Sequence, residues 1–205
     1  FAMMGLVFLI PNRIAFSLWS LNLLTFFTKT GMKRYGMRMK ENLSIYGAGD
    51  SPTFAHMASG AIIALVILIL WHSRRHLSAV FRKAIFNDPN VDDSDEILSY
   101  RAAVIIFVLS SIVMIVWMNQ AGLPWLMSIV FILLTLTILL GLTRAVAQGG
   151  VAVSIAPIIP SVFMVSGFGS TALTTSGVSA LAMTWTWGSD MRTTVMTSAA
   201  HGMFL

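Results

Sequence analysis

Long stretches without a charged residue dominate the chain, and they determine the elements that we expect. A helix needs about 20 residues to cross roughly 30 Å of hydrocarbon. Twenty-three uncharged residues lie between Asp50 and Arg74, and forty-two lie between Arg101 and Arg144. The first stretch predicts one membrane-spanning helix over residues 53–72. The second is long enough for two.

Polar and helix-breaking residues interrupt the longer stretch near its middle: Asn119, Gln120, Gly122 and Pro124. Pro removes a backbone donor, and such a group is typical of a turn. Trp117 and Trp125 flank it, and Trp is enriched where a chain meets the membrane surface. We therefore expect a helical hairpin with spans over 102–119 and 124–143, turning at the interface.

A further uncharged stretch, nearer the N-terminus, is shorter. Only fifteen uncharged residues lie between Arg13 and Lys29. A span over 14–28 requires that one of these two side chains reaches back to the interface, or that the helix is tilted. The segments 29–52 and 73–101 carry most of the charges and are expected to connect the spans outside the membrane.

The last stretch has forty-five uncharged residues, 145–189, but it is rich in Pro, Gly, Ser and Thr. Pro157 and Pro160 interrupt its first half, and glycines with hydroxyl-bearing residues follow. An unbroken helix is therefore improbable there. We expect broken or re-entrant helices over 149–188. Half-helix ends of this kind form binding sites in transporters, because they present N–H or C=O groups to solutes.

These elements predict an all-α fold, a single polytopic transmembrane helical bundle over residues 1–205. Composition excludes a water-soluble globule, since 57% of the residues are hydrophobic and only 10% are charged. The lipid bilayer is thus the first expected partner. The chain has no Cys, which excludes disulfides, thiolate metal sites and a Cys nucleophile.

Basic residues suggest an orientation. With the spans above, seven Lys and Arg fall on the side of segment 73–101 and five on the other. Because positive charge accumulates in cytoplasmic loops, 73–101 is predicted to be cytoplasmic. Within it, apolar residues recur at three- and four-residue steps, which is typical of an amphipathic helix on the headgroups or continuing the span. The net charge of +5 therefore fits loop topology better than nucleic-acid binding.

No metal, cofactor or enzymatic site is expected. The acidic cluster between Asp88 and Glu96 lacks the Gly and the bidentate Glu of a calcium loop, and it better suits the capped start of a helix near Asp95. His72 and His76 are four residues apart, a metal-binding spacing, but no third ligand is near. Motifs for a Ser or zinc hydrolase and for a phosphate-binding loop are absent from the sequence.

Candidate functional residues are ionisable or small polar groups at or inside the expected spans. His56 could be a proton-coupling group or a surface cap, and Asp190 with Arg192 could be a substrate or gating pair or an interfacial ion pair. The full set of substrate-path candidates is Asp50, His56, Ser166, Gly167, Gly169, Thr171, Thr174, Asp190 and Arg192.

Four short motifs carry a resemblance to a known family: residues 11–19, residues 46–52 with His56 and Gly60, residues 100–103, and residues 187–192. In these the chain resembles an uncharacterised bacterial family of polytopic membrane proteins, known only as domains of unknown function. That family is distantly similar to oligopeptide transporters. The similarity spreads over nearly all of the chain, as the C-terminal part of longer proteins. It implies the transporter class and an inner, cytoplasmic membrane of bacteria.

The leading hypothesis is a secondary-transporter-like protein that moves a small polar or peptide-like solute by alternating access. Residues 149–177, with residues 46–56 opposite, would line its path. The alternative is a non-transporting membrane protein whose small residues pack helices together. An intramembrane enzyme would need a nucleophile and a base within hydrogen-bond reach. Expected partners are the lipid, the solute and further copies of the chain in a homo-oligomer.

Overall fold

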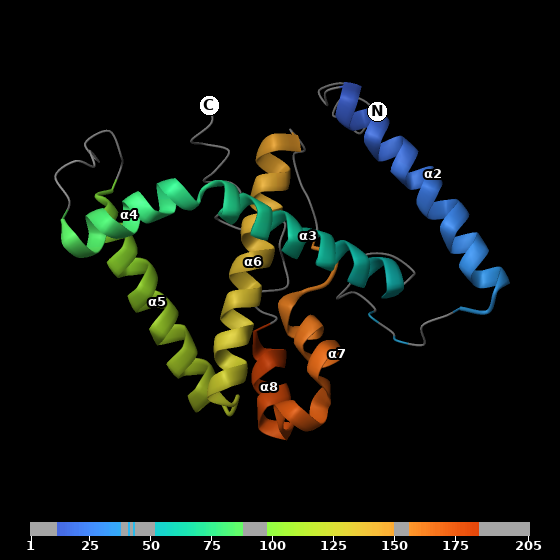
Figure 1. The fold of residues 1–205 in the computed structure, drawn as a ribbon. Helices are drawn as coiled ribbons and strands as arrows, with labels where there is room; N and C mark the ends of the chain where they lie inside the picture. The colour runs from blue at the N-terminus through green and yellow to red at the C-terminus, as the bar shows by residue number, and fades with distance from the viewer. Residues whose placement is uncertain are drawn as a thin grey trace, which may run out of the picture.

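The computed structural model describes residues 12–37, 41, 43, 52–87, 98–149 and 156–184. These residues form seven helices and no strand. The helices are α2 (Asn12–Arg34), α3 (Pro52–His72), α4 (Arg74–Phe86), α5 (Tyr100–Gln120), α6 (Trp125–Gly149), α7 (Pro160–Leu173) and α8 (Thr175–Met183). Figure 1 shows their arrangement. The predicted all-α fold is confirmed.

Three of the described helices, α3, α5 and α6, are long and apolar enough to cross a membrane. Their sides expose large apolar residues: Leu68, Leu109 and Leu126, one on each helix, are 67%, 59% and 67% exposed. Water-soluble proteins rarely present apolar surface of this extent. Helices of this length and composition, with apolar flanks, indicate an integral membrane protein.

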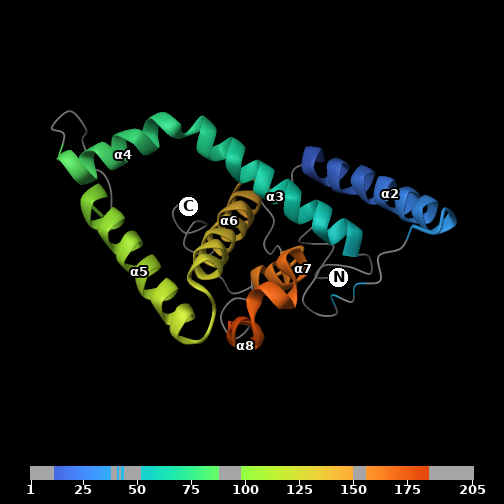
Figure 2. The same ribbon diagram turned by 60° about the horizontal axis from the view of Figure 1, so that its bottom comes forward.

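Helix α2 contains the expected span 14–28 but is not one of these three. It lies to one side of the other helices (Figures 1 and 2) and buries none of its residues. Near its C-terminal end, the Nζ atom of Lys29 lies 5.6 Å from the centre of the Phe54 ring on α3. Helix α2 continues to Arg34, so the first residues of the expected segment 29–52 are helical. The membrane crossing of α2 stays a prediction.

Helices α5 and α6 form a hairpin whose turn lies where the polar residues predict it. Helix α5 ends at Gln120, and Asn119 stabilises the turn by donating from Nδ2 to the Leu123 carbonyl at 3.0 Å. Gly122 adopts a φ of 106°, a conformation that Gly reaches without steric cost. Pro124 directly precedes α6. It cannot donate a hydrogen bond, which suits the start of a helix.

Helix α4 occupies the amphipathic part of segment 73–101 and continues α3 after a bend at Ser73. It packs against α5, which follows at Tyr100. The expectation of a helix start near Asp95 is wrong, because Leu98 and Ser99 are not helical. The hydroxyl of Ser99 accepts a hydrogen bond from the backbone N–H of Ala102 at 3.4 Å and so caps α5.

The segment expected to contain broken helices does so in its described part. Residues 156–159 are non-helical and almost completely buried, and Pro160 is the first residue of α7. Gly169 interrupts α7 with a φ of 76° and a ψ of 158°. Thr174, at a φ of 61°, separates α7 from α8, and its hydroxyl accepts from the N–H of Gly177 at 3.2 Å. Both helices are consequently short.

The buried core forms along α6. Around the hairpin turn, Met118, Leu123 and Phe131 pack against Met164 of α7 and Leu181 of α8. Further along α6, Ile138 and Leu142 pack with Ala156 and with Ile62 of α3. A third cluster joins Leu43, Ala55 and Ile158. Helix α3 lies across α6, and α7 and α8 lie beside the first half of α6 (Figure 1).

Candidate functional site

Three polar side chains from distant parts of the chain meet between α3 and α7. The Nε2 atom of His56, on the second turn of α3, lies 2.8 Å from Oε2 of Glu41. It also lies 3.2 Å from Oγ of Ser166, on α7. Glu41 precedes α3 by eleven residues, and Ser166 follows His56 by 110. We call these three residues the Glu41–His56–Ser166 cluster.

Apolar packing brings the three elements of the cluster together. Ala55, the neighbour of His56, is buried against Leu43 and Ile158, and Phe163 packs on the same cluster. The ring of Phe163 also lies 6.2 Å from the ring of His56. Since Leu43 is two residues from Glu41 and Phe163 is three residues from Ser166, burying this apolar group places the polar side chains face to face.

The ionisation of the Glu41 carboxylate determines which nitrogen of His56 carries a proton. Hydrogen bonds from Ser166 and from His56 lower the pKa of Glu41, and the charge of His56 adds to this effect, while partial burial opposes it. An ionised carboxylate can only accept hydrogen bonds. The Nε2 atom of His56 therefore carries the proton that it shares with Glu41.

The cluster is partly accessible to solvent. The side chains of His56 and Glu41 are 26% and 30% exposed, and Ser166 lies on the exposed side of α7. Either ring nitrogen of a histidine can carry a proton, and the exposed fraction of the His56 side chain gives water access to it. The arrangement is suited to binding and releasing a proton beside the broken helix.

The sequence did not single out Glu41. It stands in a segment with five Lys and Arg, where an acid is most simply interpreted as a local counter-charge. It is the only Asp or Glu among the residues that the structure describes. Its closeness to His56 depends on the packing of Leu43 and Ala55, which no local pattern reveals. The available signal was an isolated acid eleven residues before an apolar span that contains a histidine.

The remaining candidates on the broken helices do not join the cluster. Gly167 and Gly169 have no neighbouring atom within 4 Å of the place where a Cβ would lie, and Thr171 is exposed. Thr174 instead contacts the α5–α6 turn, where its hydroxyl lies 3.4 Å from the Gly122 carbonyl oxygen. Asp50, Asp190 and Arg192 lie outside the described residues.

A hollow of about 270 Å³ lies between α7 and α8. Its lining is apolar except for Ser161. Ile159, Ser161, Val162 and Val165 of the expected path segment 149–177 line it, but none of the nine substrate-path candidates does. Apart from Ser161, the hydroxyl-bearing side chains of α7 and α8 lie on exposed surface, and Ser166 is the one that contacts the ionisable pair.

Potential metal ligands are scarce among the described residues. Among residues 12–37, 41, 43, 52–87, 98–149 and 156–184, no three His, Asp or Glu side chains come together in a way that could hold a metal ion. His72 and His76 lie near the α3–α4 bend, and His76 packs edge-on against Tyr100 at 6.1 Å.

The apolar helices, the broken α7–α8 pair and the ionisable cluster define an integral membrane protein with a polar site at the end of a membrane-length helix. The chain belongs to a family of unknown function (DUF6785), whose profile matches residues 1–205. No match was found among curated proteins or among solved structures. Membership agrees with the resemblance to an uncharacterised family that the sequence motifs indicate.

Proposed function

We propose that this chain forms part of a secondary-transporter-like protein, similar to oligopeptide transporters, in a bacterial cytoplasmic membrane. It moves a small polar or peptide-like solute by alternating access. The observation that carries the proposal is the contact of Ser166, on a broken helix, with the ionisable pair of His56 and Glu41. Broken helices beside ionisable groups are the usual elements of transporter sites.

In this proposal His56 binds the coupling proton. Protonation of its free ring nitrogen gives a cation that faces the Glu41 carboxylate at 2.8 Å. The resulting ion pair holds Glu41 more tightly, whereas the neutral ring leaves Ser166 and Glu41 freer to bind a solute. Since the cluster joins α3 to α7, a change in its charge alters how these two helices are held together.

The same three residue types occur in Ser hydrolases, but the geometry argues against nucleophilic catalysis. In a hydrolase triad the acid contacts Nδ1, and the opposite nitrogen, Nε2, takes the proton of the Ser. Here Glu41 and Ser166 both contact Nε2. A nitrogen that donates to Glu41 has no lone pair with which to accept the proton of Ser166. We therefore propose a proton-binding role and no enzymatic activity.

A second candidate is a non-transporting protein whose small residues serve helix packing. Its support is Gly141, where the backbone of α6 meets Ile62 of α3 so closely that an added Cβ would overlap it. Gly177 of α8 similarly packs against Leu123, which lies 3.1 Å from its Cβ position. These contacts join helices within the chain, so they stabilise a transporter equally well. The open space around Gly167 and Gly169 favours transport.

The proposal is tested with the full-length protein in liposomes that contain a pH-sensitive dye. Small peptides and amino acids are added outside under an inward proton gradient. We expect at least one of them to accelerate acidification of the lumen. His56→Gln should abolish this solute-dependent flux, because Gln cannot carry the proton.

His76→Gln is the matched control, since His76 is an exposed histidine on α4, away from the cluster. It should leave the flux unchanged. Solute-dependent proton flux that survives in His56→Gln would rule out the coupling role. A wild-type protein that shows no flux with any of these solutes would favour the packing candidate.

A further inference from the structure

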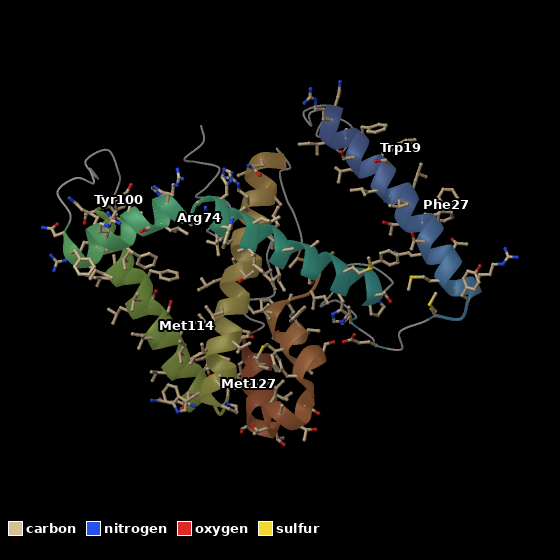
Figure 3. The ribbon with its side chains drawn as sticks, in the orientation of Figure 1. Trp19, Phe27, Arg74, Tyr100, Met114 and Met127 are labelled. Carbon is tan, nitrogen blue, oxygen red and sulfur yellow. The ribbon has the colours of Figure 1, made fainter. Side chains whose placement is uncertain are left out.

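A second polar feature lies at the opposite end of α3 from His56, at its bend into α4. A pocket of about 350 Å³ is formed there by Trp71, His72, Arg74 and Arg75. Figure 3 shows Arg74 at this bend. All four side chains come from one short stretch, because α3 ends at His72 and α4 begins at Arg74.

No carboxylate among the described residues compensates the positive charge of the pocket. Neither Arg74 nor Arg75 forms an ion pair with any residue in the described ranges, where Glu41 is the only acid and is bound to His56. The guanidinium of Arg74 lies 4.7 Å from the centre of the Trp71 ring. Stacking on an aromatic ring orients a guanidinium while leaving its N–H edge free for an anion. The pocket is thus complementary to an anionic group.

The position of the pocket indicates which anion it meets. Helix α3 is long and apolar enough to cross a membrane, and the pocket lies at its end. Helix α4 then presents Phe81, Ile85 and Phe86, which are exposed by 50%, 69% and 78%. A basic helix with an exposed apolar side lies in the plane of the headgroups. Trp71 is also typical of that level.

We propose that this pocket binds the phosphate of an anionic phospholipid headgroup. Arg74 and Arg75 supply paired N–H donors to the phosphate oxygens, an arrangement that a guanidinium forms with two parallel hydrogen bonds. His72 adds a third donor, and Trp71 lies against the glycerol and the first acyl carbons. Bound lipid holds the bend between α3 and α4 in place at the membrane surface.

The test uses the full chain purified in a neutral detergent and titrated with phosphatidylglycerol, with phosphatidylcholine as the neutral lipid. The readout is the lipid concentration that half-saturates the rise in the unfolding midpoint. We expect a rise with phosphatidylglycerol alone. Each basic residue near an anionic surface strengthens binding about fivefold, so Arg74→Gln combined with Arg75→Gln should raise the half-saturating concentration about 25-fold.

Lys33→Gln combined with Arg34→Gln is the matched control, because it removes the same charge from the end of α2. It should bind phosphatidylglycerol as the wild type does. The proposal would be overturned if both double variants weakened phosphatidylglycerol binding equally. It would also be overturned if the Arg74→Gln and Arg75→Gln variant bound this lipid as the wild type does. Inorganic phosphate alone should give no rise, and a rise equal to that of the lipid would show a free-anion site instead. If the double variant does not fold, Arg75→Gln alone should weaken binding about fivefold.

Discussion

A Cβ atom placed on Gly141 of α6 would lie 3.2 Å from the Cγ2 atom of Val66 on α3. Side chains seldom pack so closely. The two helices approach to this distance because Gly141 has no side chain. The contact fixes α3, which carries His56 and ends at the basic pocket, against the longest described helix.

Replacing Gly141 by Ala should therefore destabilise the protein. Ala is normally better than Gly inside a helix by about 1 kcal/mol, but here its methyl group meets Ile62 and Val66 and causes overpacking that costs about 1–3 kcal/mol. Thermal unfolding of the purified full chain in detergent measures the effect. Gly60→Ala is the control, because no atom lies within 4 Å of its Cβ position. It should raise the midpoint, and a similar rise for Gly141→Ala would show that α3 and α6 are not in close contact.

The break in α7 gives a second matched pair of variants. Gly169 has backbone angles that are almost exclusive to Gly, so Gly169→Ala should cost about 1–3 kcal/mol. Gly167 is helical and equally open, and Gly167→Ala should be neutral or stabilising. The same unfolding measurement compares them. Equal effects of the two substitutions would mean that α7 is not interrupted at Gly169.

The stability supplied by Glu41 should depend on pH in a defined direction. Its pKa is lower in the folded protein than in the unfolded chain, so its contribution is complete above the ordinary glutamate pKa, about 4.5, and is lost as pH falls through the folded value. Unfolding midpoints of the wild type and Glu41→Gln, measured from neutral pH downwards, should differ most above about pH 4.5 and converge in acid. If the difference between the two unfolding midpoints grows as pH falls, the pKa of Glu41 is not lowered by folding.

Thr143 of α6 should be replaceable by Val without loss of stability. Its hydroxyl is buried and has no hydrogen-bond partner among the described residues, so Thr143→Val removes an unsatisfied polar group that costs about 1–3 kcal/mol. Thr135, buried on the same helix, donates to the Phe131 carbonyl at 2.8 Å. Thr135→Val loses that bond and should lower the unfolding midpoint. If Thr143→Val is the more damaging of the two, its hydroxyl is satisfied in the membrane.

Local features of the chain were sufficient to predict most of the helices. Uncharged runs place α3, α5 and α6, because the length of hydrocarbon to be crossed fixes the length of an apolar helix. The turn at Gly122 and the interruption of α7 follow from Gly and Pro residues, which raise the free energy of a continuous helix. The start of α5 was misplaced because Ser99 and the acids before it are all residues that can cap a helix.

The contacts between distant helices could not be predicted in the same way. His56 and Ser166 were both candidates, but nothing local indicates that they meet each other or that Glu41 completes the group. Their meeting depends on how Leu43, Ala55 and Ile158 pack. Packing of this kind is non-directional and depends on the whole chain. The same reason explains why the hollow between α7 and α8 is apolar while the predicted polar residues lie elsewhere.

The central claim is that the hydroxyl-bearing side of the broken helix borders water inside the membrane. Because the chain has no Cys, a single introduced thiol reports on one position. Thr171→Cys places it on exposed surface of α7, five residues after Ser166, and Leu109→Cys places it on the apolar side of α5. In intact membranes, a water-soluble thiol reagent should react with Thr171→Cys and leave Leu109→Cys unmodified. Equal protection of both thiols would contradict the account.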